Sequence, residues 1–237
     1  MVNRFNDQLD KVVRGNRASL GFGQHAAAAK PRLFIMAEAG SIEYGAALPG
    51  VDAVLVAAPC RCPAEKSAVL RGCAVGKETE HTGCDFVVLD LDGAIVDAGE
   101  DMARLLRIDG GLSDAQLRAL GGLDVSAIIA DAGLGESMTF RDLLAVQRLV
   151  DFSGKLLLLS FPKIYSKAEM QALSDSGITG VVIDASKIDT AALRSMVDSL
   201  EPKKRGKEKA AAIVTCPPPS AAPSPETEPE IEPDEDD

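Results

Sequence analysis

Apolar and polar positions follow two patterns that alternate along the chain from Pro31 onward. Short runs that are apolar almost throughout are separated by longer segments in which apolar residues recur every three or four positions. Short continuous apolar runs are typical of strands buried on both faces, and the longer segments are typical of amphipathic helices. The predicted strands are residues 32–39, 52–58, 85–91, 125–132, 155–161 and 179–185.

Helical spacing follows most of these predicted strands. Ser113, Thr139 and Ser166 are predicted N-caps, because a hydroxyl before the first turn accepts a hydrogen bond from a free backbone N–H. Repeated strand and helix units predict a parallel sheet built of βαβ units. The predicted helices in this region are residues 64–72, 100–108, 113–123, 139–154, 166–177 and 188–202.

The expected fold is therefore α/β, with about six parallel strands. Right-handed crossovers leave two arrangements open, an incomplete or degenerate barrel and an open doubly wound sheet. The segments GVDAVLVAA, GCDFVVLDL and GITGVVIDA each pass from glycine into an apolar strand, and this rhythm resembles TIM-type (β/α) barrels, including small bacterial barrel-like proteins. The resemblance implies a fold and no particular reaction. A complete barrel of eight would need units hidden in residues 16–31 or 92–111.

Three regions differ in composition. Residues 1–30 are predicted to hold a helix over 3–14 and a loop, with the helix outside the main domain or closing one end of it. Residues 31–202 form the predicted barrel-like domain. Residues 203–237 are basic, then rich in proline and acid, and are predicted to be a disordered tail. A solubilising tail with no fixed partner is favoured, and the alternatives are electrostatic self-association and tethering of a protein partner.

Charge and cysteine content narrow the class of function. The net charge is −11, and the last twelve residues carry eight carboxylates, which leaves about −3 for the rest. An acidic chain with few aromatic residues is not expected to bind nucleic acid, and its apolar runs are too short for a membrane helix. No secretory signal is visible, and the five cysteines have no zinc or disulfide spacing, so we expect reduced thiols in a cytoplasmic protein.

Polar residues stand where the predicted strands end, and ligands of α/β proteins bind at the carboxyl ends of strands. Ser160, Lys163 and Asp131 are the predicted substrate-binding residues. Carboxylate oxygens suit Mg²⁺, so Asp90, Asp92 and Asp184 are the predicted metal ligands.

The segment LDLDGAIVD at residues 89–97 resembles the first motif of haloacid dehalogenase-like proteins. The resemblance implies that Asp90 is a nucleophile, that Asp92 is an acid or base, that Ser160 contacts phosphate, and that Mg²⁺ assists. The sequence departs from the family at Ala94, where the family usually has Thr or Val. The motif also lies at the end of the third predicted strand, whereas in the family it normally lies on the first.

Three functions remain open on the sequence. The favoured one is a small-molecule or partner-binding module without robust catalysis. The alternatives are a Mg²⁺-dependent phosphatase or related hydrolase that uses Asp90 and Asp92, and a barrel enzyme that acts on a small phosphorylated metabolite.

Overall fold

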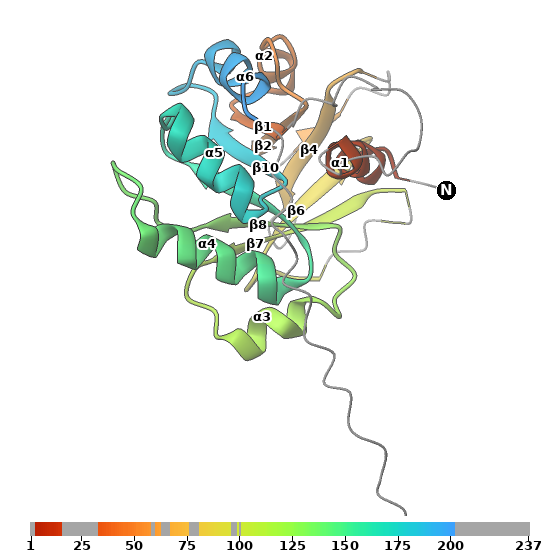
Figure 1. Ribbon diagram of the computed structural model, residues 1–237. Coiled ribbons are helices and arrows are strands. Elements are labelled where there is room, and N and C mark those ends of the chain that lie inside the picture. The colour runs from red at the N-terminus through yellow and green to blue at the C-terminus, as the bar shows by residue number, and fades with distance from the viewer. Residues whose placement is uncertain are drawn as a thin grey trace, which may run out of the picture. The chain divides into compact units, whose positions relative to one another are not determined.

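The computed structural model covers the barrel and the helix that precedes it (Figure 1). The predicted tail and the loop at 16–31 lie outside the described residues. The described residues are 3–15, 33–57, 60–62, 67–75, 81–95, 99 and 101–201.

Eight parallel strands form a closed barrel in which each strand pairs with the next along the chain and the last pairs with the first. The chain is therefore a TIM-type barrel. The expectation of about six strands is wrong, and so is the alternative of an open doubly wound sheet, because both edges of the sheet are paired. The strands are β1 (Phe34–Ala39), β2 (Ala53–Ala57), β4 (Leu70–Val75), β6 (Phe86–Asp90), β7 (Ala103–Asp109), β8 (Ala127–Asp131), β9 (Leu156–Phe161) and β10 (Gly180–Asp184).

The two additional strands lie in segments that were predicted to be helical. β4 overlaps the predicted helix 64–72, and β7 overlaps the predicted helix 100–108. Arginines interrupt both strands, Arg71 in β4 and Arg104 and Arg107 in β7, so their apolar residues do not form a continuous run. The unit hidden in residues 92–111 is thus β7.

Helices cover mainly the part of the barrel formed by the later strands (Figure 1). The three predicted caps are confirmed, because Ser113, Thr139 and Ser166 each form a capping box. Between β2 and β7 the described residues contain no helix, and two short parallel strands, β3 (Cys60–Arg61) and β5 (His81–Thr82), pair with each other. The helices after β1 are α2 (Ile42–Ala46), α3 (Asp114–Leu120), α4 (Phe140–Ser153), α5 (Lys167–Ser176) and α6 (Thr190–Asp198).

Side chains along each strand point alternately to the outside and the inside of the barrel, and the apolar ones form two hydrophobic clusters. Residues on the outer face pack beneath the helices and loops, and residues on the inner face fill the barrel. The interior is thus a packed core without a channel. Its strand residues are Phe34, Met36, Ala53, Leu55, Leu70, Phe86, Val88, Ala103, Leu105, Ala127, Ile129, Leu158 and Val182.

The helix α1 (Arg4–Gly15) closes the N-terminal end of the barrel. Its apolar residues Phe5, Leu9 and Val12 are buried in the inner cluster. The Phe5 ring lies 5.5 Å from the ring of Phe34 and 4.8 Å from that of Phe86, which are the first residues of β1 and β6. Of the two placements considered for this helix, closure of one end is confirmed.

A membrane-spanning helix would need a long apolar stretch. None of the helices in the described part of the chain is long and apolar enough to cross a membrane.

Candidate functional site at the C-terminal mouth of the barrel

The inner-face alternation continues beyond the core and places polar side chains at the C-terminal mouth. Side chains alternate between the two faces of a strand, so the residue two positions beyond the last inner core residue lies on the same inner face. On six of the eight strands this residue is polar. These mouth residues are Glu38, Asp90, Arg107, Asp131, Ser160 and Asp184.

Glu38 and Arg107 form an ion pair across the mouth. In the closed strand order β1 and β7 are four places apart in a ring of eight, so they lie on opposite sides. Arg107 Nη2 lies 2.5 Å from Glu38 Oε1, and both side chains are about 40% exposed. Arg107 Nε is buried and has no hydrogen-bond partner among the described residues. The pair therefore covers the packed interior and leaves a guanidinium donor unused.

Two cavities adjoin this pair. One of about 470 Å³ lies toward β2 and β4 and includes Arg107, and one of about 460 Å³ lies toward β8 and β9. Glu38 and Asp184 line both cavities. Volumes of this size suit small metabolites. The first is also lined by Tyr44, Leu55, Ala57, Ala74 and Ser186, and the second by Asp131, Leu134, Ser160, Phe161 and Lys187.

Asp184 is held in its ionised form. The Ser186 hydroxyl donates to Asp184 Oδ1 at 2.6 Å, Lys187 Nζ lies 2.9 Å from Oδ2, and the Ser186 backbone N–H donates at 2.9 Å. These contacts, with the Ser186 hydroxyl first, lower the pKa of Asp184 to about 2. The same contact with Asp184 raises the pKa of Lys187. Asp184 is thus a fixed negative charge at the mouth.

The structure brings together part of the predicted substrate-binding set. Asp131 and Ser160 line the same cavity as Asp184. Asp131 Oδ1 also accepts a hydrogen bond from the Gly133 backbone N–H at 2.9 Å. Lys163 is turned aside, because its ammonium donates to the Glu136 carbonyl.

The predicted magnesium set is not brought together. Asp90 ends β6, which is opposite β10 in the barrel, so Asp90 and Asp184 are on different sides of the mouth. Asp92 lies in the exposed turn after β6. Among the described residues, no three His, Cys, Asp or Glu side chains are grouped so that they could hold a metal ion. The donor set therefore does not fit Mg²⁺.

The dehalogenase-like interpretation also loses its structural basis. In that family the motif belongs to the first strand, whereas Asp90 lies on the fourth of the eight strands of a closed barrel. Gly93 follows Asp90 in a turn in which the Gly93 N–H donates to the Asp90 carbonyl at 2.9 Å. The part of the motif at residues 89–93 is accordingly a strand end and its turn.

Arg107 is the site residue that sequence reasoning missed. It lies within the segment predicted to be the helix 100–108, and a strand end was not sought there. The available signal was the alternation of Ala103, Leu105 and Arg107 on one face.

Comparisons with known proteins support the fold. Models of protein families and curated proteins gave no match. A solved structure from Aquifex aeolicus is similar with a TM-score of 0.51 at 10% identity, over 83% of this chain and 97% of that one. An HpcH/HpaI aldolase from Desulfitobacterium hafniense gives 0.45 at 11% identity (69% and 89% covered), and tryptophan synthase from M. tuberculosis gives 0.46 at 10% (83% and 97%). At these identities the likeness concerns the fold alone.

Proposed function

We propose that this barrel binds a small zwitterionic metabolite at its C-terminal mouth, with a carboxylate of the ligand on Arg107. The observation that carries the proposal is the Glu38–Arg107 pair, which joins opposite strands beside two cavities of metabolite size. Barrel proteins bind their ligands at this face.

Arg107 supplies the anion-binding part of the site. A guanidinium has five N–H donors in a planar fork that matches a carboxylate. Glu38 takes one Nη2 donor, and Nε has no partner within the described residues. A ligand carboxylate at Arg107 would receive the Nη donors that Glu38 leaves unused.

The surrounding carboxylates favour a ligand that also carries a positive charge or a hydroxyl group. Glu38 and Asp184 line both cavities, and Asp131 lines the second. Negative groups outnumber positive ones here, since Lys187 is already paired with Asp184. An ammonium or hydroxyl group donates to such carboxylates, whereas a second negative charge is repelled.

A phosphorylated metabolite fits this mouth less well. The N-terminus of α6 would be the natural phosphate site, but Asp189 caps it and accepts from the N–H groups of Ala191 and Ala192. Lys163 donates to the Glu136 carbonyl and Lys187 to Asp184. The N-terminus of α6 and the two lysines are therefore already engaged within the protein.

An enzyme acting on the same ligand is a second candidate, and the position of Glu38 favours it. Glu38 lies against Arg107 and lines both cavities, so its carboxylate is placed to exchange a proton with a ligand that Arg107 holds. Solvent deuterium appearing on a bound ligand, and lost in Glu38→Gln, would establish this activity. Binding without exchange would leave a binding module.

The test is a ligand-binding screen by calorimetry or ligand-observed NMR. The panel contains amino acids, hydroxy acids and sugar phosphates, and the proteins are wild type, Arg107→Met and Arg104→Met. Arg104 is the matched control, because it lies on the same strand but on the outer face, and pairs with Asp124 at 2.6 Å. We expect a zwitterion to bind wild type and Arg104→Met alike and to bind Arg107→Met about 10- to 100-fold more weakly.

Two results would overturn the proposal. One is preferential binding of the sugar phosphates. The other is equal affinity of a zwitterion for wild type and Arg107→Met, provided that the variant unfolds at the same urea concentration as Arg104→Met.

A further inference from the structure

Three buried cysteines lie together in the outer hydrophobic cluster, on the side of the barrel between β2 and β6. The described residues of this side contain no helix. Cys62 Sγ and Cys84 Sγ are 2.8 Å apart, and Cys84 Sγ is 3.8 Å from Cys73 Sγ. None of these three cysteines forms a disulfide in the structure. The Cys62–Cys84 separation is within about 1 Å of the S–S bond of a disulfide.

The backbone holds this pair in place independently of the sulfur atoms. β3 and β5 pair in parallel, Cys60 with His81 and Arg61 with Thr82, so the strand residues before Cys62 and Cys84 are fixed side by side. Gly83 has φ +73°, and a Cβ there would lie 2.8 Å from the Cys62 carbonyl oxygen. Only glycine permits both this conformation and this approach.

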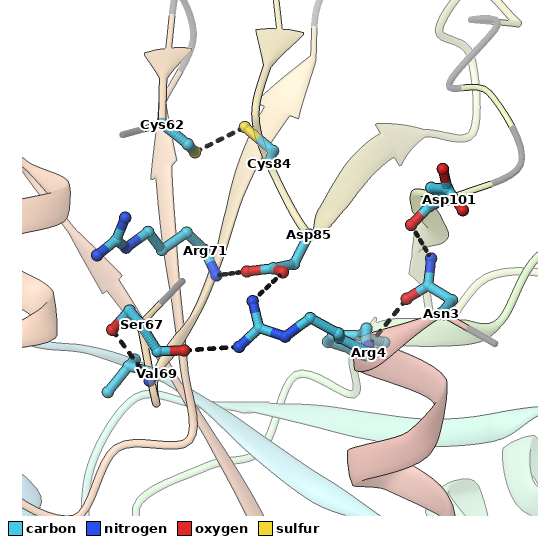
Figure 2. Close-up of polar contacts among 10 residues, drawn as sticks. Asn3, Arg4, Cys62, Ser67, Val69, Arg71, Cys84, Asp85 and Asp101 are labelled. Atoms are coloured by element: carbon cyan, nitrogen blue, oxygen red, sulfur yellow. Dashed lines mark hydrogen bonds and ion pairs between the residues drawn. The ribbon is translucent and has the colours of Figure 1, made fainter. Parts of the chain in front are cut away.

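The residue after Cys84 is anchored in the same way (Figure 2). Asp85 accepts from the Arg71 backbone N–H at 2.9 Å and pairs with Arg4 of α1 at 2.7 Å. Arg4 also donates to the Ser67 carbonyl at 2.6 Å, on the segment between Cys62 and β4. The two thiols are thus presented to each other by a hydrogen-bonded frame.

We propose that Cys62 and Cys84 form a reversible disulfide by exchange with a small-molecule disulfide. One cysteine thiolate attacks the small disulfide, forms a mixed disulfide and releases one small thiol. The other cysteine thiolate then attacks the protein sulfur of the mixed disulfide and displaces the second small thiol. The protein loses two protons and two electrons, and the small disulfide gains both.

Exposure makes the reaction selective. Cys62 and Cys84 each retain 9% exposure, whereas Cys73 is completely buried. A small disulfide therefore meets the proposed pair before the third thiol. A metal is a poorer explanation of the cluster, because the described part of the chain holds no group of three such side chains that suits a metal ion.

The bridge would close the chain around β4. It would join residues 62 and 84 across the part of the barrel that only the short strands β3 and β5 cover among the described elements. A crosslink over a segment of this length constrains the unfolded chain. We expect it to raise the thermal midpoint of unfolding by about 5–10 °C.

The test uses the full chain with Cys60→Ser and Cys216→Ser, so that only the three clustered thiols remain. The protein is incubated with oxidised glutathione, and its intact mass, non-reduced peptide map and thermal midpoint are measured before and after reduction. We expect a loss of two hydrogens, a crosslinked peptide pair containing Cys62 and Cys84, and the stated rise in midpoint. Adding Cys73→Ser is the matched control and should leave the bridge intact.

Three outcomes would overturn the proposal. One is that all three thiols alkylate after denaturation of the oxidant-treated protein. Another is a bridge that includes Cys73. The third is a bound metal ion in native mass spectrometry whose removal is required before any oxidation. The principal measurement keeps all three thiols, so its result does not depend on a cysteine variant of the cluster folding.

Discussion

At the scale of single residues, the Glu38–Arg107 pair is poorly explained by stability. Both side chains are about 40% exposed, and exposed ion pairs contribute only about 0–1 kcal/mol. Holding two long side chains over the mouth also costs conformational entropy. A role in binding accounts better for a pair that meets between opposite strands.

A second residue-scale feature is the cap of α5. Glu169 accepts from the Met138 backbone N–H at 2.9 Å, from the Ser166 hydroxyl at 2.7 Å and from the Ser166 N–H at 2.9 Å. These bonds, with Met138 first, lower the pKa of Glu169 from 4.5 to about 2. The carboxylate also ties the segment before α4 to α5.

This pKa predicts a specific pH dependence. A carboxyl whose pKa is lower in the folded state stabilises the fold above its unfolded pKa and loses that contribution as the pH falls toward its folded pKa. We therefore expect Glu169→Gln to show a weaker fall in stability than wild type between about pH 4.5 and pH 2, measured by urea unfolding. Glu43→Gln, in the first turn of α2 where Ser41 caps without a capping box, supplies the comparison. An unchanged slope in Glu169→Gln would contradict the assignment.

The sequence located part of the mouth, for a reason visible at the level of residues. Asp131, Ser160 and Asp184 end strands that are apolar throughout, so their place at the carboxyl edge follows from the pattern. Arg107 could not be placed in the same way. Met102, Leu105 and Leu106 have the spacing of a helix face, and only pairing with β6 and β8 makes this segment a strand.

At the scale of elements, the strand β4 was also missed because its local sequence pattern disagrees with the long-range pairing that makes it a strand. Its sequence LRGCAV contains an arginine and a glycine, which are unusual in a buried strand. Gly72 faces the interior, where a Cβ would lie 2.3 Å from the Phe86 ring. The glycine that weakened the strand pattern is thus required by an aromatic ring on the neighbouring strand, and no local pattern contains that information.

The close approach of Gly72 to the Phe86 ring predicts the effect of adding a side chain at position 72. Gly72→Ala should destabilise the fold by about 1–3 kcal/mol, because the Phe86 ring must move within a core that already includes Phe5. Gly40→Ala is the matched control, since nothing lies within 4 Å of a Cβ at that position. Chemical denaturation of both variants measures the difference, and equal stabilities would show that the interior is not tightly packed at Gly72.

At the scale of the whole molecule, the barrel is complete, while helices cover it unevenly in the part of the chain that the structure describes. α3 to α6 lie along the strands β7 to β10, and the described elements near β4 and β6 are the short pair β3 and β5 (Figure 1). The two strands beyond the expected six are β4 and β7, and among the described residues no helix flanks β4 and none separates β6 from β7. Closure itself depends on long-range pairing between β1 and β10, which no segment encodes alone.

Because helices cover the described barrel unevenly, we expect its strands to be protected unevenly from hydrogen exchange. Backbone amides of β4 and β6 should exchange with solvent deuterium sooner than those of β8 and β9, because opening a strand beneath two short strands exposes less packed surface than opening one beneath helices. Hydrogen exchange followed by mass spectrometry measures this in the reduced protein. Equal protection around the barrel would show that opening is global.

Closure of the N-terminal end by α1 has a practical consequence for handling the protein. Phe5 fills the space between the first residues of β1 and β6, so a ligand can exchange only through the opposite end. A tether placed ahead of Asn3 therefore attaches to the face away from Glu38 and Arg107. Immobilised in that way on a sensor surface, the molecules present their open ends to the flowing solution.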